Sequence, residues 1–216
     1  MKPVKGLALA RSCGLLWSQT KIQLPVIFVN ALIQGLLVMS RDSNTSGALN
    51  IVLAVLSAAV LILAAGLVLA GLQQIPAKPI SWRTALTTLK GHGLRFAVWA
   101  VALVVVAQFA FSWWIWPGVI VLAATPYLLI ATLSDEANSL AANFRAIAAH
   151  PLRWLALSLL VVIFGTLAYL LSAVTVFFVR GFAASALVWF VAGYLVAWVM
   201  GAFSLLFKSY LGKRNE

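Results

Sequence analysis

Acidic residues are almost missing from this chain of 216 residues, which carries four Asp and Glu against fifteen Lys and Arg. Asp42, Asp135, Glu136 and Glu216 all lie outside the long apolar runs. Coupled transporters usually place a carboxylate inside a membrane-spanning segment as the ion relay. The sequence therefore argues against proton- or sodium-coupled transport, and also against a hydrolase that uses paired carboxylates in a cleft.

Cysteine and histidine are also scarce. Cys13 is the only cysteine, which excludes an internal disulfide; we expect a small apolar side chain in a buried position, with lipidation as the alternative. The two histidines, His92 and His150, are separated by a whole pair of apolar runs and have no cysteine or carboxylate at ligand spacing. A metal or haem site is thus the least favoured hypothesis for the two histidines. We predict no cofactor and no catalytic residues, because no nucleophile–base–acid set, phosphate-binding glycine loop or zinc-type spacing is present.

Charged residues make up only 9% of the chain and hydrophobic residues 64%, whereas soluble domains are about a quarter charged. Six apolar runs are long enough to cross about 30 Å of hydrocarbon as helices. They cover approximately residues 22–39, 51–72, 95–114, 117–133, 152–178 and 183–207. Their apolar residues run continuously instead of alternating, which favours helices over a barrel. We therefore predict an all-α, polytopic membrane protein with one transmembrane domain over residues 1–216.

The cations predict the orientation, since Lys and Arg are retained on the cytoplasmic side of short loops. All but two of the fifteen fall before the first run, between the second and third, between the fourth and fifth, or after the sixth. The exceptions are Arg41 and Arg180. Both termini should then be cytoplasmic. This distribution explains the net charge of +11 without a nucleic-acid partner and favours contact with anionic lipid headgroups.

The sequence contains an internal repeat. The stretches HGLRF at residues 92–96 and HPLRW at residues 150–154 coincide when residues 81–96 are laid on residues 139–154. Each copy is a short amphipathic stretch, a bend at Gly93 or Pro151, and an apolar run that begins with arginine; a weaker third copy covers residues 6–25. We predict three units, roughly residues 4–72, 78–133 and 136–207. Each would be a cytoplasmic-side amphipathic elbow helix followed by a transmembrane hairpin.

Two hypotheses explain the arginine and histidine residues of the elbows. Arginine and histidine at the cytoplasmic edge of a span commonly reach to headgroup phosphates as simple anchors. Alternatively the elbows converge, so that these side chains form one pocket for an anion such as a lipid phosphate. The candidate lipid- or anion-binding residues are His92, Arg95, His150, Arg153, Lys21 and Arg83.

Polar residues inside the apolar runs are uncharged, and we expect them to form hydrogen bonds between helices. The alternative is a pore or substrate cavity lined by Asn30, Gln34 and Gln108. The remaining polar candidates are Thr125, Ser158, Thr166 and Tyr169.

Small residues recur every four positions at Gly193, Ala197 and Gly201, and this spacing permits close helix contacts within the bundle or between copies of the chain. Trp113, Trp114 and Trp116 in the turn SWWIWPG are typical of an outer headgroup belt. Asp135 and Glu136 fit the N-terminal cap and first turn of a helix over residues 136–149.

Three stretches carry a family resemblance: GLALARSCGLLWSQTKIQLP, LQQIPAKPISWRTALTTLKGHGLRF and PYLLIATLSDEANSLAANFRAIAAHPLRWLALSL. They look like a superfamily of uncharacterised bacterial six-span membrane proteins that includes the membrane domain fused to some glycerophosphodiester phosphodiesterases. The resemblance implies six spans in the bacterial inner membrane. The catalytic domain of the fused members has no counterpart here, so the resemblance implies no hydrolase activity.

The sequence thus predicts a non-enzymatic inner-membrane accessory or scaffold protein that binds anionic lipid or a membrane partner. The small-residue face of Gly193, Ala197 and Gly201 would dock that partner or a second copy of the chain. Two alternatives remain: a small transporter or channel subunit with the polar path near Asn30 and Gln34, and a membrane-resident immunity protein that blocks a toxin.

Overall fold

The computed structural model describes residues 23–38, 40, 47–74, 81–134, 136–178 and 181–214. Within these ranges the chain is helical and has no strand. The first described helix is Gln23–Val38. The others are α2 (Gly47–Leu72), α3 (Trp82–Trp113), α4 (Ile115–Ala124), α5 (Leu128–Thr132), α6 (Ser139–Ala149), α7 (Pro151–Phe178) and α8 (Phe182–Arg214). The predicted all-α class is confirmed.

The long apolar helices of the structure are those of a membrane protein in length and composition. By length and composition, α2, α3 and residues Phe182–Gly212 of α8 can each cross a bilayer, and the bent pair α6–α7 makes up to four. The helix Gln23–Val38 and the stretch Trp116–Thr132 are shorter. Every predicted run is therefore mainly helical in its described part, with a break at residues 125–127 in the run 117–133, but six crossings are not confirmed.

The two elbows inside the described residues differ. Ser139–Ala149 and Pro151–Leu167 meet at an angle of 105°, because Pro151 lacks a backbone N–H and its ring excludes the preceding carbonyls from a continuous helix. At the equivalent position α3 runs through Gly93 without interruption. The bend predicted at Gly93 is wrong as a helix break, since glycine only weakens a helix and does not block it. Most of the third predicted elbow, including Cys13 and Lys21, lies outside the described residues, and its last residues, 23–25, belong to the Gln23–Val38 helix.

Asn138, and not Asp135 or Glu136, caps α6. Its side chain accepts a hydrogen bond from the N–H of Ala141 at 3.0 Å. The helix begins at Ser139, so the predicted start at residue 136 was too early. The short amide side chain of asparagine serves this position as well as a carboxylate does.

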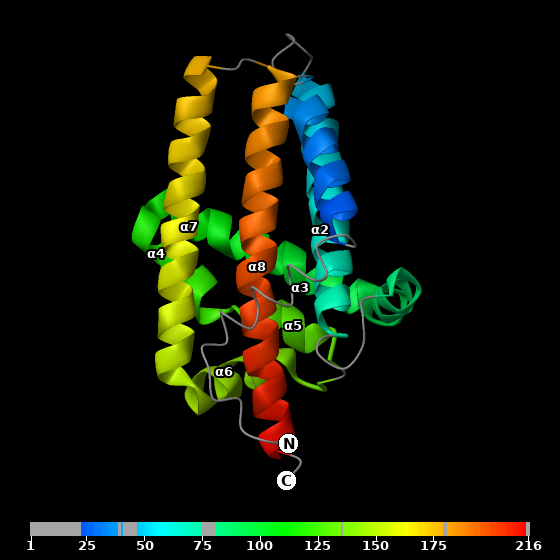
Figure 1. Ribbon diagram of the computed structural model, residues 1–216, viewed down its shortest axis with the longest axis vertical. Coiled ribbons are helices and arrows are strands. Elements are labelled where there is room, and N and C mark those ends of the chain that lie inside the picture. Colours follow the sequence, from blue (N-terminus) through cyan, green and yellow to red (C-terminus); the bar gives the residue numbers. More distant parts are fainter. Residues whose placement is uncertain are drawn as a thin grey trace.

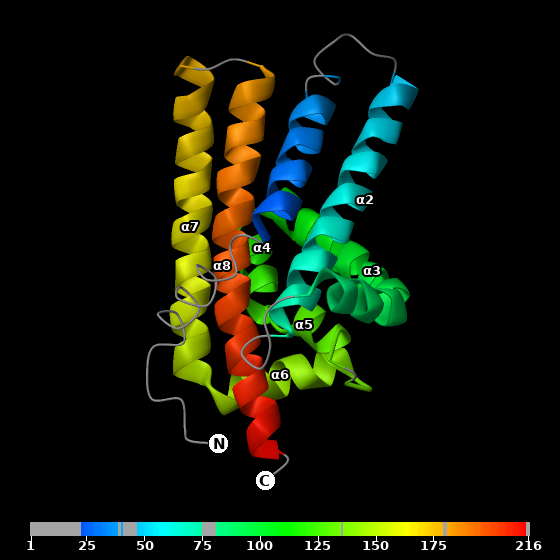
Figure 2. The ribbon, with the colours of Figure 1, turned by 45° about the vertical axis from the view of Figure 1, so that its right-hand side comes forward.

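The helices do not form one parallel bundle. The Gln23–Val38 helix, α2, α7 and α8 run along the length of the molecule, whereas α3 crosses behind them (Figures 1 and 2). In agreement with this crossing, the buried residues of α2 lie only at its C-terminal end, from Gly66 to Leu72. A side chain at Gly66 would meet Leu89 and Phe96 of α3 at 2.8 and 3.1 Å, so this glycine permits the close crossing.

The core lies toward one end of the molecule, where α5 and α6 meet the ends of α2 and α8 (Figure 2). The buried ring of Tyr127 packs edge-on against Phe203 and is stacked on Phe207 of α8. Lys208 donates to the carbonyl of Gln73, whose side chain donates to the carbonyl of Ile130. These contacts join three elements that the sequence places far apart.

Candidate functional site

The chain between α4 and α5 breaks its helix at Thr125, Pro126 and Tyr127. Pro126 cannot donate a hydrogen bond, so the carbonyls at the end of α4 need other partners. Thr125 donates to two of these four carbonyls. Its hydroxyl donates to the carbonyl of Val121 at 2.7 Å, and its N–H donates to the carbonyl of Leu122 at 3.4 Å.

The other two carbonyls are satisfied from the α6–α7 elbow. The side-chain amide of Asn143 donates to the carbonyl of Ala124 at 2.7 Å, and its oxygen accepts from the N–H of Tyr127 at 2.9 Å. The indole of Trp154 donates to the carbonyl of Ala123 at 2.8 Å. All four final carbonyls of α4 thus accept a hydrogen bond. Broken helices in membranes are tolerated where protein satisfies their backbone, and this break meets that condition.

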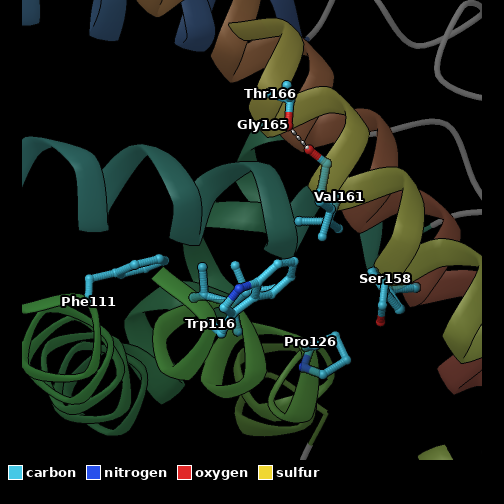
Figure 3. Close-up of a pocket in the computed structure, with 12 residues that line it drawn as sticks. Phe111, Trp116, Pro126, Ser158, Val161, Gly165 and Thr166 are labelled. Atoms are coloured by element: carbon cyan, nitrogen blue, oxygen red, sulfur yellow. Dashed lines mark hydrogen bonds between the residues drawn. The ribbon is translucent and has the colours of Figure 1, made fainter. Parts of the chain in front are cut away.

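A cleft of about 600 Å³ lies beside this break, between α4 and α7 (Figure 3). One wall comes from the end of α3 and from α4, the other from one face of α7, and Phe203 of α8 contributes as well. The lining residues are Phe111, Trp116, Val119, Leu122, Ala123, Pro126, Ser158, Val161, Val162, Gly165, Thr166 and Phe203. The volume falls within the range of about 300 to 1,000 Å³ that is typical of small-molecule sites.

The lining is almost entirely apolar, and its two hydroxyls differ. Thr166 donates to the carbonyl of Val162 in its own helix at 2.9 Å, so it does not join two helices as predicted. Ser158 is 7% exposed, and its hydroxyl has no hydrogen-bond partner. The side chain of Tyr169, the third polar residue predicted on this run, lies outside the described part of the chain.

The residues that line the cleft also show which part of α7 lies beside the turn between α3 and α4. Phe111 and Trp116, on either side of this turn, line the same cleft as Val161 and Gly165 (Figure 3). Residues 161–166 lie about 15 to 22 Å along α7 at 1.5 Å per residue, near the middle of its 28 residues. Trp116 therefore lines the cleft at the level of the middle of α7.

Arg95 takes part in packing within the protein. Its Nη2 donates to the carbonyls of Glu136 and Ala137 at 2.5 and 2.9 Å and to the hydroxyl of Ser139 at 2.8 Å. The guanidinium thus holds α3 against the start of α6. This is a different role from both predictions for Arg95, the headgroup anchor and the anion pocket.

The other predicted elbow residues lie in different settings. His92 Nδ1 is 3.2 Å from the carbonyl of Thr88 in the same helix, and His150 forms the C-terminal cap of α6. Arg83 and Arg153 are exposed. Lys21 lies outside the described residues.

The predicted polar path is not assembled. Gln34, 1% exposed, accepts from the hydroxyl of Ser57 in α2 at 2.5 Å, donates to its carbonyl at 3.1 Å and contacts Asn30. Gln34 therefore joins two helices, as predicted. Gln108 lies on an exposed face of α3 and is not buried with them. Thr125 serves the helix break described above.

The small-residue face of α8 is used inside the chain. A side chain at Gly193 would come within 3.1 Å of Ile27, and Ala197 and Gly201 are buried. Gly193 thus permits the close approach of α8 to the Gln23–Val38 helix. The described residues hold no group of three or more His, Cys, Asp or Glu that could bind a metal ion.

Sequence reasoning missed the roles of Asn143, Trp154 and Ser158. The sequence does contain signals for two of them, because a buried Asn in an amphipathic helix and a Pro inside an apolar run each require hydrogen-bond partners. The pairing of Asn143 with the break depends on the turn between α5 and α6, and that of Trp154 depends also on the bend at Pro151. No family model, curated protein or solved structure matches this chain.

Proposed function

We propose that this chain is a non-enzymatic membrane protein, of the bacterial inner membrane by its resemblance, which binds a lipid in the cleft between α4 and α7. The observation that carries the proposal is an apolar cleft of about 600 Å³ among helices suited to the bilayer interior. A water-filled cavity would need several polar partners for its water, whereas this lining favours a hydrocarbon chain. The protein would act as an accessory protein that holds a lipid in place.

The proposal includes a topology. The Gln23–Val38 helix, α2, α7 and α8 cross the bilayer, and α3 and α4 enter from the cytoplasmic side and return at mid-depth. The shared cleft of Trp116 and Val161 supports this arrangement. The cations fit it, because the turn SWWIWPG carries no Lys or Arg and both termini remain cytoplasmic. Non-helical backbone at this depth is tolerated where it is enclosed by protein.

Lipid binding is favoured over ion transport by the hydrogen bonds of the helix break. Transporters use unwound backbone carbonyls to coordinate their ions. Here the carbonyls from Val121 to Ala124 already accept bonds from Thr125, Asn143 and Trp154. The buried pair Asn30 and Gln34 likewise packs against α2.

Filling the cleft tests the proposed function. Gly165 lines the cleft, and a side chain there meets nothing within 4 Å, so Gly165→Trp introduces an indole without a clash at its Cβ. Leu159→Trp is the matched control, because Leu159 is 60% exposed on the same helix and does not line the cleft. Native mass spectrometry of gently extracted protein should show a retained lipid in wild type and Leu159→Trp, and its loss in Gly165→Trp. Equal lipid retention in both variants would refute the proposal.

Labelling tests the topology separately. Ser112 precedes the α3–α4 turn and is exposed. In a Cys13→Ser background, Ser112→Cys should resist a membrane-impermeant maleimide added outside intact cells. Rapid labelling from outside would restore the six crossings predicted from the sequence.

A further inference from the structure

The side chain of Ser158, in the lining of the cleft, has a hydroxyl that can donate a hydrogen bond to a bound molecule. It lines the cleft, its side chain is more than nine-tenths buried, and it has no hydrogen-bond partner. A buried hydroxyl without a partner is costly in apolar surroundings. The occupant that removes this cost carries an acceptor oxygen beside its hydrocarbon.

The depth of Ser158 in the bilayer indicates which oxygen of a lipid accepts its hydrogen bond. The helix α7 has 28 residues and is about 42 Å long at 1.5 Å per residue; when centred on a hydrocarbon core of about 30 Å, it extends about 6 Å beyond the core at each end. Ser158 lies seven residues after Pro151, about 10 Å along the helix. It is thus only about 4 Å inside the hydrocarbon boundary on the side of the α6–α7 elbow. The ester carbonyls of glycerolipids lie at this boundary, between headgroup and acyl chain.

The face of α7 beyond Ser158 provides room for the acyl chain. Val161, Val162 and Gly165 continue this face toward the middle of the helix and line the cleft. No close neighbour within the protein explains why residue 165 is a glycine, since a Cβ at Gly165 would meet nothing within 4 Å. A glycine within a helix is destabilising relative to alanine. An acyl chain that packs closely against α7 at this point accounts for the glycine.

The charges at the elbow end of α7 fit an anionic headgroup. Arg153 lies five residues before Ser158 and is exposed, and Arg145 on α6 is exposed as well. Cations at this depth attract the phosphates and net charge of anionic lipids. Arg153 and Ser158 lie about 140° apart around the helix axis, so it is the long side chain of Arg153 that reaches toward a phosphate above the cleft.

We infer that the cleft takes an anionic glycerophospholipid of the cytoplasmic leaflet, with an ester carbonyl on the Ser158 hydroxyl, its acyl chain along Gly165, and its headgroup at Arg153. This inference rests on the proposed function and adds the lipid class, its orientation and the leaflet from which it comes. Arg95 has no part in it, because its guanidinium is bonded to the start of α6.

The experiment titrates delipidated protein with three lipids by native mass spectrometry: diacyl phosphatidylglycerol, its dialkyl ether analogue, and diacyl phosphatidylcholine. Wild type should bind the diacyl form about fivefold more tightly than the ether, which lacks the carbonyl. Ser158→Ala should remove this preference. Ser204→Ala should keep it, because Ser204 is another buried hydroxyl without a partner and does not line the cleft.

The headgroup is tested in the same titration. Arg153→Gln should reduce the preference for phosphatidylglycerol over phosphatidylcholine and leave the ester preference intact, whereas Arg83→Gln, at another exposed arginine, should change neither. Equal wild-type affinity for ester and ether lipids overturns the role of Ser158, and equal affinity for both headgroups overturns that of Arg153. If Gly165→Trp abolishes lipid binding while either equality holds, this inference alone fails. If Gly165→Trp binds lipid normally, the proposed function fails with it.

Discussion

Replacement of Asn143 should destabilise the protein more than any other single polar substitution in α6. Asn143 is fully buried, and its amide bonds both sides of the helix break, at the carbonyl of Ala124 and the N–H of Tyr127. Asn143→Leu keeps the branching at Cγ, with larger end groups, and removes both bonds. Two buried backbone groups then lose their partners.

The magnitude follows from those two groups. A buried donor or acceptor left without a partner costs about 1 to 3 kcal/mol, so the pair costs about 2 to 6 kcal/mol. Side-chain hydrogen bonds in membrane proteins average only about 0.6 kcal/mol, which sets a lower bound of about 1 kcal/mol. We expect the upper range, because the carbonyl is held at the end of α4 by Pro126 and cannot return to a regular helix.

The assay is reversible unfolding of purified protein in mixed micelles, followed by circular dichroism. Asn138→Ala is the control, because Asn138 is an exposed cap of the same helix and its loss should cost about 1 kcal/mol. If Asn143→Leu is no less stable than Asn138→Ala, the break is not held by Asn143 and this reasoning is refuted.

Three further predictions concern packing and use the same unfolding assay. Gly66→Val should cost about 1 to 3 kcal/mol, because its Cβ would lie 2.8 Å from the buried Leu89, whereas Gly91→Val, with nothing within 4 Å, should be tolerated. Arg95→Met keeps a long side chain but removes the Nη2 group that donates to three acceptors at the start of α6; a loss of about 1 to 3 kcal/mol supports a packing role, and unchanged stability supports a headgroup anchor. Gln34→Leu should cost about 0.6 to 2 kcal/mol through its bonds to α2, and no loss would contradict a structural role for that pair.

The sequence predicted the elements better than their arrangement. Apolar runs locate helices reliably because a backbone in hydrocarbon must satisfy its own hydrogen bonds, and Pro151 marked a true bend. The same alignment predicted a bend at Gly93, where the helix continues. Proline enforces a break by covalent geometry, whereas glycine only permits one, so similar patterns gave different structures.

The candidate site was the least predictable part. Arg95 and Arg153 occupy equivalent places in the repeat, yet one holds the start of α6 and the other is exposed. Asn30 and Gln34 were expected to bond between helices, and Gln34 does so. Ser158 was assigned the same role and instead lines the cleft without a partner. The roles of these side chains follow from their neighbours, which residue type alone does not specify.

Composition and continuity of the apolar runs determined by themselves that this is a helical membrane protein and where its helices lie, because both follow from the cost of exposing polar backbone to lipid. Only the tertiary structure decided that α3 crosses the other helices, that Asn143 and Trp154 close a broken helix, and that a cleft opens beside Ser158. These features depend on which side chains meet across distant segments. The angle at Pro151 and the close contact at Gly66 set those meetings, and local sequence patterns do not encode them.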